Sequence, residues 1–155
     1  MTISTDDSID KFGTEDTVTA GGGTSAVSDG AMAASSDVVS WTNDDDAALA
    51  AFILTWQYPT GTIDGKIFIH ARSLNINGTL DEPQPTTSNR TGRIGTFDIS
   101  PGQATTTNTP YKTICRLPNS ETSSEYEFYP YNDSGVTMTA GWTMTVIPIT
   151  SGPHP

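Results

Sequence analysis

The densest group of possible metal ligands in this 155-residue sequence is a run of three carboxylates, Asp44, Asp45 and Asp46, preceded by Asn43. Hard cations such as Ca²⁺ take several oxygen ligands, so the run is a weak candidate Ca²⁺ site. Neighbouring side chains diverge in an extended segment, and the alternate-ligand spacing of an EF-hand loop is missing. A solvated turn that caps a short helical turn explains the same residues. We therefore predict no metal site and no other cofactor.

Residue pairs that could perform acid–base catalysis are few. Glu125 and Glu127 lie two apart and would share one face of a strand, as a pair of glycosidase carboxylates could, or as part of a wet sheet surface. His70 alternates with Lys66 and Arg72, which predicts an exposed, mildly basic stripe without a catalytic partner. Local motifs suggest neither a Ser-His-Asp set nor a phosphate-binding glycine loop. We expect the chain not to be an enzyme.

The single cysteine and the three tryptophans have both a chemical and a structural interpretation. Cys115 lies in an apolar alternation, which favours a buried and inert thiol over a nucleophile. Trp41, Trp56 and Trp142 could line a flat platform for a sugar, but their positions in alternating segments favour packing in a core.

The charge balance limits the classes of partner. The chain has 7 Lys and Arg against 18 Asp and Glu, a net charge of −11. Phosphate binding needs clustered basic side chains, and anionic membranes repel an acidic protein, so we expect no direct contact with nucleic acid or membrane. The N-terminus has neither a basic start nor an apolar core, so no secretory signal is predicted, and no apolar run is long enough to span a membrane.

Short alternating segments separated by turn residues dominate the sequence from about Ser25 onward. Thr suits a pleated surface, and Gly, Asn and Pro supply turns. The turn sequence Asn132-Asp133-Ser134-Gly135 predicts a β-hairpin, and the polar residues 73–90 predict a long loop that is either functional or mobile. The expected strands are residues 38–41, 49–58, 63–72, 93–99, 111–117, 124–129 and 136–147.

This pattern predicts an all-β fold, a two-sheet antiparallel β-sandwich for which we expect a jelly-roll topology. The order of the strands does not follow from the pattern. We expect one sandwich domain over residues 25–150 and a short tail at 151–155. Residues 1–24 are polar and glycine-bearing, so they are predicted to be an extended N-terminal arm that is disordered or docked. Isolated apolar residues in the arm, Ile9, Phe12 and Val18, are the predicted contacts with a partner.

Three stretches of the sequence carry a family resemblance. Residues 40–46 (SWTNDDD), 117–129 (LPNSETSSEYEFY) and 141–148 (GWTMTVIP) resemble a group of small virion structural proteins of tailed phages. The similarity covers most of residues 38–150. It implies a jelly-roll decoration, or cement, protein that is made in the host bacterial cytoplasm, assembles as trimers or dimers and lies on the outer surface of the capsid. Its partner would be the major capsid protein, whose joints it reinforces.

A second hypothesis comes from a different functional class. The chain could be a carbohydrate-binding or receptor-binding module of a phage tail that uses the 73–90 loop and exposed aromatic residues. A sandwich fold alone does not separate the two hypotheses, because function depends on sites that differ between proteins of one fold.

Overall fold

The computed structural model describes residues 8–12, 16–17, 23–38, 40–57, 63–99, 109–118 and 124–153. Within these ranges the chain forms β-strands and a single 3-10 turn, η2 (Ser35–Asp37), but no α-helix. The strands are β1 (Ser8–Phe12), β2 (Asp16–Thr17), β3 (Ala31–Met32), β4 (Ser40–Asn43), β5 (Leu49–Trp56), β6 (Lys66–Leu74), β7 (Arg93–Asp98), β8 (Thr109–Arg116), β9 (Ser124–Asp133) and β10 (Thr143–Pro153).

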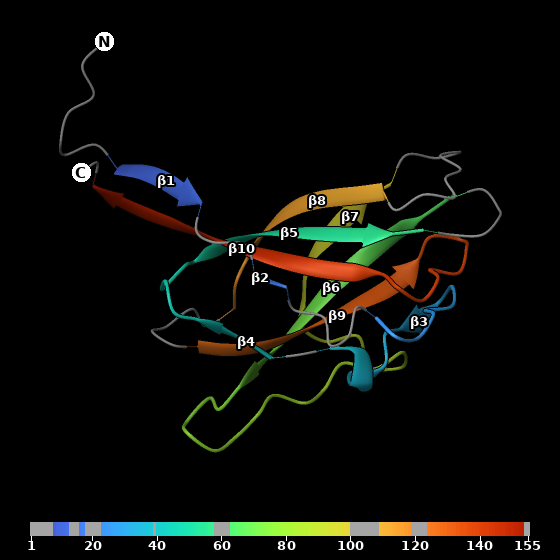
Figure 1. The fold of residues 1–155 in the computed structure, drawn as a ribbon. Coiled ribbons are helices and arrows are strands. Elements are labelled where there is room, and N and C mark those ends of the chain that lie inside the picture. Colours follow the sequence, from blue (N-terminus) through green and yellow to red (C-terminus); the bar gives the residue numbers. More distant parts are fainter. Residues whose placement is uncertain are drawn as a thin grey trace, which may run out of the picture.

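The strands form two antiparallel sheets that pack as a sandwich, as predicted (Figure 1). One sheet has the order β1-β10-β5-β8, with β2 also pairing with β10. The other has the order β3-β9-β6-β7, with β4 also pairing with β9. We call them the β5 sheet and the β6 sheet.

The chain pairs its first half with its second half in reverse order. β6 pairs with β7, β5 with β8, β3 and β4 with β9, and β1 and β2 with β10. The fold is therefore one long antiparallel hairpin whose turn is the segment 75–92. Its two paired halves run side by side and alternate between the two sheets.

The core lies between the sheets, and it is formed by every second residue along the strands. On β5 the buried residues Phe52, Leu54 and Trp56 point into the sandwich, and on β6 Ile67 and Ile69 do so. Phe52 meets Phe128 of β9 edge to face, with the ring centroids 4.8 Å apart. Side chains from both sheets interdigitate here, which accounts for the sandwich.

The predicted hairpin at Asn132–Gly135 is wrong. β9 continues to Asp133 and β10 starts only at Thr143, and the two strands belong to different sheets. The buried Asn132 side chain donates hydrogen bonds to the carbonyls of Val27 and Val136, at 2.8 and 2.7 Å. These bonds turn the chain between the sheets, and Met138 forms a bridge with Val27 instead of continuing a strand.

The two ends of the described chain form a ribbon. β1 pairs with residues 149–153 of β10, whereas β5 starts at Leu49 opposite Ile149. Among the described residues, β10 beyond Ile149 therefore pairs with β1 alone. Figure 1 shows β1 and the end of β10 extending away from the rest of the sandwich. We call residues 8–12 and 149–153 the terminal ribbon.

Candidate interaction surfaces

The segment 75–92, which we call the cover loop, folds back over the outer face of the β6 sheet. The Ala71 amide donates to the Gly92 carbonyl at 2.8 Å, and the Ser73 amide donates to the Glu82 carboxylate at 2.9 Å. Across the sheet, the Met32 amide donates to the Thr87 hydroxyl at 3.1 Å. The cover loop is thus tied to β6 inside the sheet and to β3 at its edge, and it forms a third layer.

Aromatic side chains on the outer face of the β6 sheet are buried beneath this layer. Tyr129 and Tyr131 each expose only 1% of their surface. The Arg90 guanidinium stacks on the Tyr131 ring at 4.2 Å, and that of Arg93 stacks on the Phe68 ring at 4.3 Å. Such cation–π contacts stabilise an aromatic face by about 0.5–2 kcal/mol.

The prediction that His70 is exposed is wrong. His70 does point to the outer face of β6, but it is 1% exposed because the cover loop lies over it. One of its ring nitrogens lies 2.7 Å from the Thr91 carbonyl oxygen, and the ring meets Tyr131 edge to face. Burial lowers the pKa of His70, and the charges of Arg93 and Arg90 lower it further, although the Thr91 hydrogen bond opposes this.

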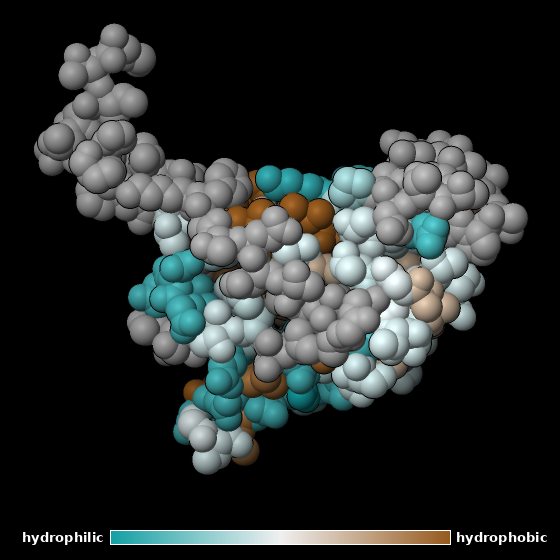
Figure 2. Space-filling view, in the orientation of Figure 1, coloured by the Kyte–Doolittle hydropathy of each residue, from teal (hydrophilic) through white to brown (hydrophobic). Residues whose placement is uncertain are grey.

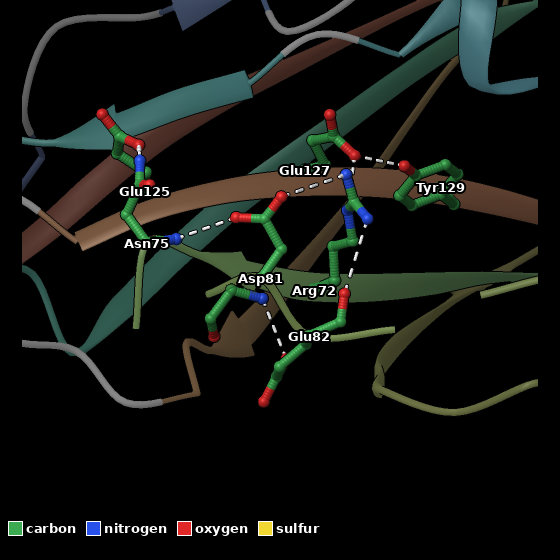
Figure 3. A network of polar contacts seen from close by, with 8 residues as sticks. Arg72, Asn75, Asp81, Glu82, Glu125, Glu127 and Tyr129 are labelled. Atoms are coloured by element: carbon green, nitrogen blue, oxygen red, sulfur yellow. Dashed lines mark hydrogen bonds and ion pairs between the residues drawn. The ribbon is translucent and has the colours of Figure 1, made fainter. Parts of the chain in front are cut away.

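A polar network fixes the start of the cover loop to β6 and β9 (Figure 3). Arg72 on β6 donates from Nε to Glu127 on β9 at 2.7 Å, and another of its nitrogens lies 3.9 Å from Asp81. The Tyr129 hydroxyl donates to the same Glu127 carboxylate. Arg72 and Glu127 have side chains only 19% and 20% exposed, so the ion pair is shielded from water. Glu127 is therefore a structural partner of Arg72.

The tip of the cover loop is closed by its own hydrogen bonds. The Ile76 amide donates to the Leu80 carbonyl at 2.7 Å, and the Gly78 amide donates to the Asn75 carbonyl at 2.9 Å. Gly78 has φ +84, a conformation that favours glycine. The Asn75 side chain hydrogen-bonds to Glu125 on β9. Ile76 and Leu80 remain 54% and 60% exposed at this tip.

The outer face of the β5 sheet has a different character. Its outward rows place Ile147, Ala51 and Ile114 side by side, then Thr145, Ile53 and Lys112. Ile114 is 55% exposed, and Ile53 and Ile147 are partly exposed. Figure 2 shows hydrophobic atoms, in brown, gathered in the region where Figure 1 draws β5, β8 and β10. Part of this face is therefore apolar.

The structure places two of the three predicted arm contacts in the terminal ribbon. Ile9 lies opposite Gly152 and Phe12 lies opposite Ile149 in the ladder with β10. Val18 lies outside the described residues. Ile9 and Phe12 thus belong to a strand of the β5 sheet, at its edge.

The acidic run 44–46 does not form a metal cluster. All three aspartates are exposed on the turn between β4 and β5, and Asp46 has φ +53. The described residues contain no group of three His, Cys, Asp or Glu side chains that could hold a metal ion. The Asn43 side chain organises the turn instead, because it exchanges hydrogen bonds with the Ala47 backbone at 2.9 and 3.0 Å.

The predicted packing roles of Cys115 and the tryptophans are confirmed. Trp41, Trp56 and Trp142 are 7%, 0% and 1% exposed, so they build the core and offer no sugar platform. Cys115 is also buried, and burial raises the pKa of its thiol to about 11, which keeps the thiol protonated at neutral pH.

Comparison with known proteins identifies no relative: no family model, no curated protein and no solved structure matches the chain. In the described part of the chain, no helix is long and apolar enough to cross a membrane.

Three exposed apolar residues, Ile76, Leu80 and Ile114, were not among the predicted contact residues. Each had a signal. Ile76 and Leu80 flank Asn77-Gly78-Thr79 inside an otherwise polar loop. Ile114 stands between Lys112 and Arg116, on the opposite side of the strand from Tyr111, Thr113 and Cys115. Single exposed apolar residues are ordinary on a protein surface, whereas several that lie together mark a contact site.

Proposed function

We propose that the chain is a phage capsid decoration protein that binds the outer surface of the head and stabilises contacts between major capsid proteins. It works by binding, without a catalytic centre. The observation that carries the proposal is the terminal ribbon, since both of its strands extend past the start of β5 and, among the described residues, pair there only with each other.

The ribbon is suited to strand addition. A two-stranded ribbon is at best marginally stable by itself in water. Unpaired strand edges are ready templates for a further strand, and an added strand gains main-chain hydrogen bonds. A capsid subunit that paired with the ribbon would complete this end of the sheet, which is how a cement protein can join its neighbours.

The pairing order supports a jelly roll as the topology of this decoration protein. In a jelly roll, eight strands in two sheets form two Greek keys. Such a fold can be drawn as one long hairpin rolled into a sandwich. The pairs β6 with β7, β5 with β8, β3 and β4 with β9, and β1 and β2 with β10 have this nested order.

Truncation tests the role of the ribbon. We would compare the full chain with a form that lacks residues 1–12 and a control that lacks only residues 1–7, which precede β1. The cut must stop before Gly23, because the Gly23 carbonyl accepts from the Gly141 amide at 2.8 Å and the Thr24 amide donates to Asp37 at 2.9 Å. Both truncated forms should therefore keep the folded sandwich.

Binding would be measured by co-sedimentation with heads of the encoding phage assembled without this protein. We expect the form without residues 1–12 to bind at least about tenfold more weakly than the control, the equivalent of about 1.4 kcal/mol. Equal binding by the two forms would refute the role of the ribbon. If the full chain bound tails and not heads, the decoration function itself would be refuted in favour of a receptor-binding module.

A further inference from the structure

Three large apolar side chains are strongly exposed among the described residues, and they form two separate surfaces. Ile76 and Leu80 lie at the tip of the cover loop, and Ile114 lies on the outer face of β8. The tip follows β6 of the β6 sheet, and Ile114 lies on β8 of the β5 sheet. Grouped exposed apolar residues with polar surroundings mark contact sites.

The tip is acidic. Asp81 and Glu82 follow Leu80 directly, and Glu125 is joined to the tip by Asn75. Arg72 offsets one of these negative charges, because it pairs with Glu127 at 2.7 Å and lies 3.9 Å from Asp81. The hydrogen bonds across the tip hold Ile76 and Leu80 in place, so a contact there would cost little conformational entropy.

The β8 face is basic. Ile114 stands between Lys112 and Arg116, which point to the same side of the strand, and all three are exposed. These are two of only 7 basic residues in the chain. Ile53 and Ile147 lie on the neighbouring strands of the same outer face and are partly exposed.

We propose that these two surfaces bind each other between copies of the chain. The tip of one copy, with Ile76 and Leu80, docks on the β8 face of the next copy around Ile114. Asp81 then faces the basic side chains that flank Ile114. Two apolar surfaces of opposite charge are complementary, and like-charged pairings of tip with tip or face with face are disfavoured.

The contact would be heterologous, because it joins two different patches. A heterologous contact closes into a ring when the rotation between copies permits, and otherwise grows into an open chain. The proposed contact uses other residues than the terminal ribbon, which comprises 8–12 and 149–153. The inference therefore stands independently of the capsid proposal, and its test uses the purified chain alone.

Mixing two disabled variants tests the contact. One variant carries Ile76→Asp and Leu80→Asp and has no functional tip, and the other carries Ile114→Asp and has no functional face. The changed residues are exposed, so both variants should fold, which circular dichroism would check. Thr137→Asp, at an exposed residue outside both surfaces, is the matched control.

Molar mass would be measured by light scattering after size exclusion. We expect the native chain and the Thr137→Asp control to associate beyond the 16.4 kDa monomer, and each disabled variant alone to stay monomeric. An equimolar mixture of the two variants should form a one-to-one dimer and nothing larger, because one intact tip meets one intact face.

Three results would overturn the proposal. A native chain that remains monomeric up to about 1 mM has no such contact of useful strength. Self-association retained by either variant would show that its surface is not required. A mixture of folded variants that stays monomeric would show that the two surfaces do not bind each other.

Discussion

The outer face of the β6 sheet lies under the cover loop, whereas the described outer face of the β5 sheet presents an apolar surface around Ile114. Tyr129 and Tyr131 are 1% exposed on the first face, and Ile114 is 55% exposed on the second. In both sheets, outward-pointing residues alternate with residues that point into the shared core. The alternation along the strands therefore does not explain the difference. Among the described residues, the cover loop is the segment that returns over the β6 face.

The contrast separates residues that stabilise the fold from residues available to a partner. Ordering a long loop costs conformational entropy, and burial of the two tyrosines with Phe68 and His70 offsets this cost. Ile114 contributes little to the fold but keeps apolar area accessible. Substitutions on the covered face should therefore change stability, and substitutions on the open face should change association.

The largest expected effect is that of Tyr131→Ala. Tyr131 stacks against Phe68 with the ring centroids 6.3 Å apart and lies under Arg90, so its removal leaves a cavity beneath the cover loop. We expect the free energy of unfolding to fall by about 3–5 kcal/mol in urea denaturation. Ile114→Ala, the control on the open face, should change it by less than about 0.5 kcal/mol. Similar losses in both variants would remove the distinction between the faces.

A smaller effect is expected from Arg72→Met. The change leaves the Glu127 carboxylate without its cation in a shielded position, which should cost about 1.5–3 kcal/mol of unfolding free energy. Lys66→Met is the control on the same strand, because Lys66 pairs with Asp98 at 3.0 Å but the side chains are 56% and 83% exposed. Its cost should stay below about 1 kcal/mol. Chemical denaturation of both variants measures the difference, and equal costs would show that the network does not brace the loop.

The smallest effect is a pH dependence that arises at His70. Its pKa is lower in the folded chain than the ordinary 6.5, so the unfolded chain binds more protons between the two values. The resulting stability is present above pH 6.5 and is lost as the pH falls through that window. We expect His70→Gln to flatten this part of the stability curve, measured as the urea midpoint from pH 7.5 to pH 5. An unchanged slope in the variant would show that His70 is not buried by the loop.

The sequence predicted the sandwich because a buried face repeats every two residues along strands such as β5 and β6. It did not predict the depth of His70, because alternation assigns a residue to a side of the sheet and cannot tell whether another segment covers that side. The cover loop is polar and carries no periodic pattern. Its position depends on contacts between residues far apart in the sequence, such as Met32 with Thr87 and Asn75 with Glu125.

The hairpin predicted at Asn132–Gly135 failed for a related reason. The turn residues are present, but the pattern of turn residues does not reveal which strands pair after the turn. Here the buried Asn132 and Ser134 side chains hold a crossing between the sheets. The candidate contacts Ile9 and Phe12 could be named from the arm's composition, whereas the ribbon that carries them depends on pairing with the far end of the chain.

The most direct test of the account is amide hydrogen exchange on the full chain, free and bound to heads assembled without it. In the free protein we predict fast exchange in β1 and at residues 150–153, and slow exchange in β6 and β9, because a ribbon of two strands opens easily. Binding should slow exchange in the ribbon and leave the covered β6 sheet unchanged. New protection of residues under the cover loop, or unchanged exchange in the ribbon on binding, would contradict the proposed binding of heads through the ribbon.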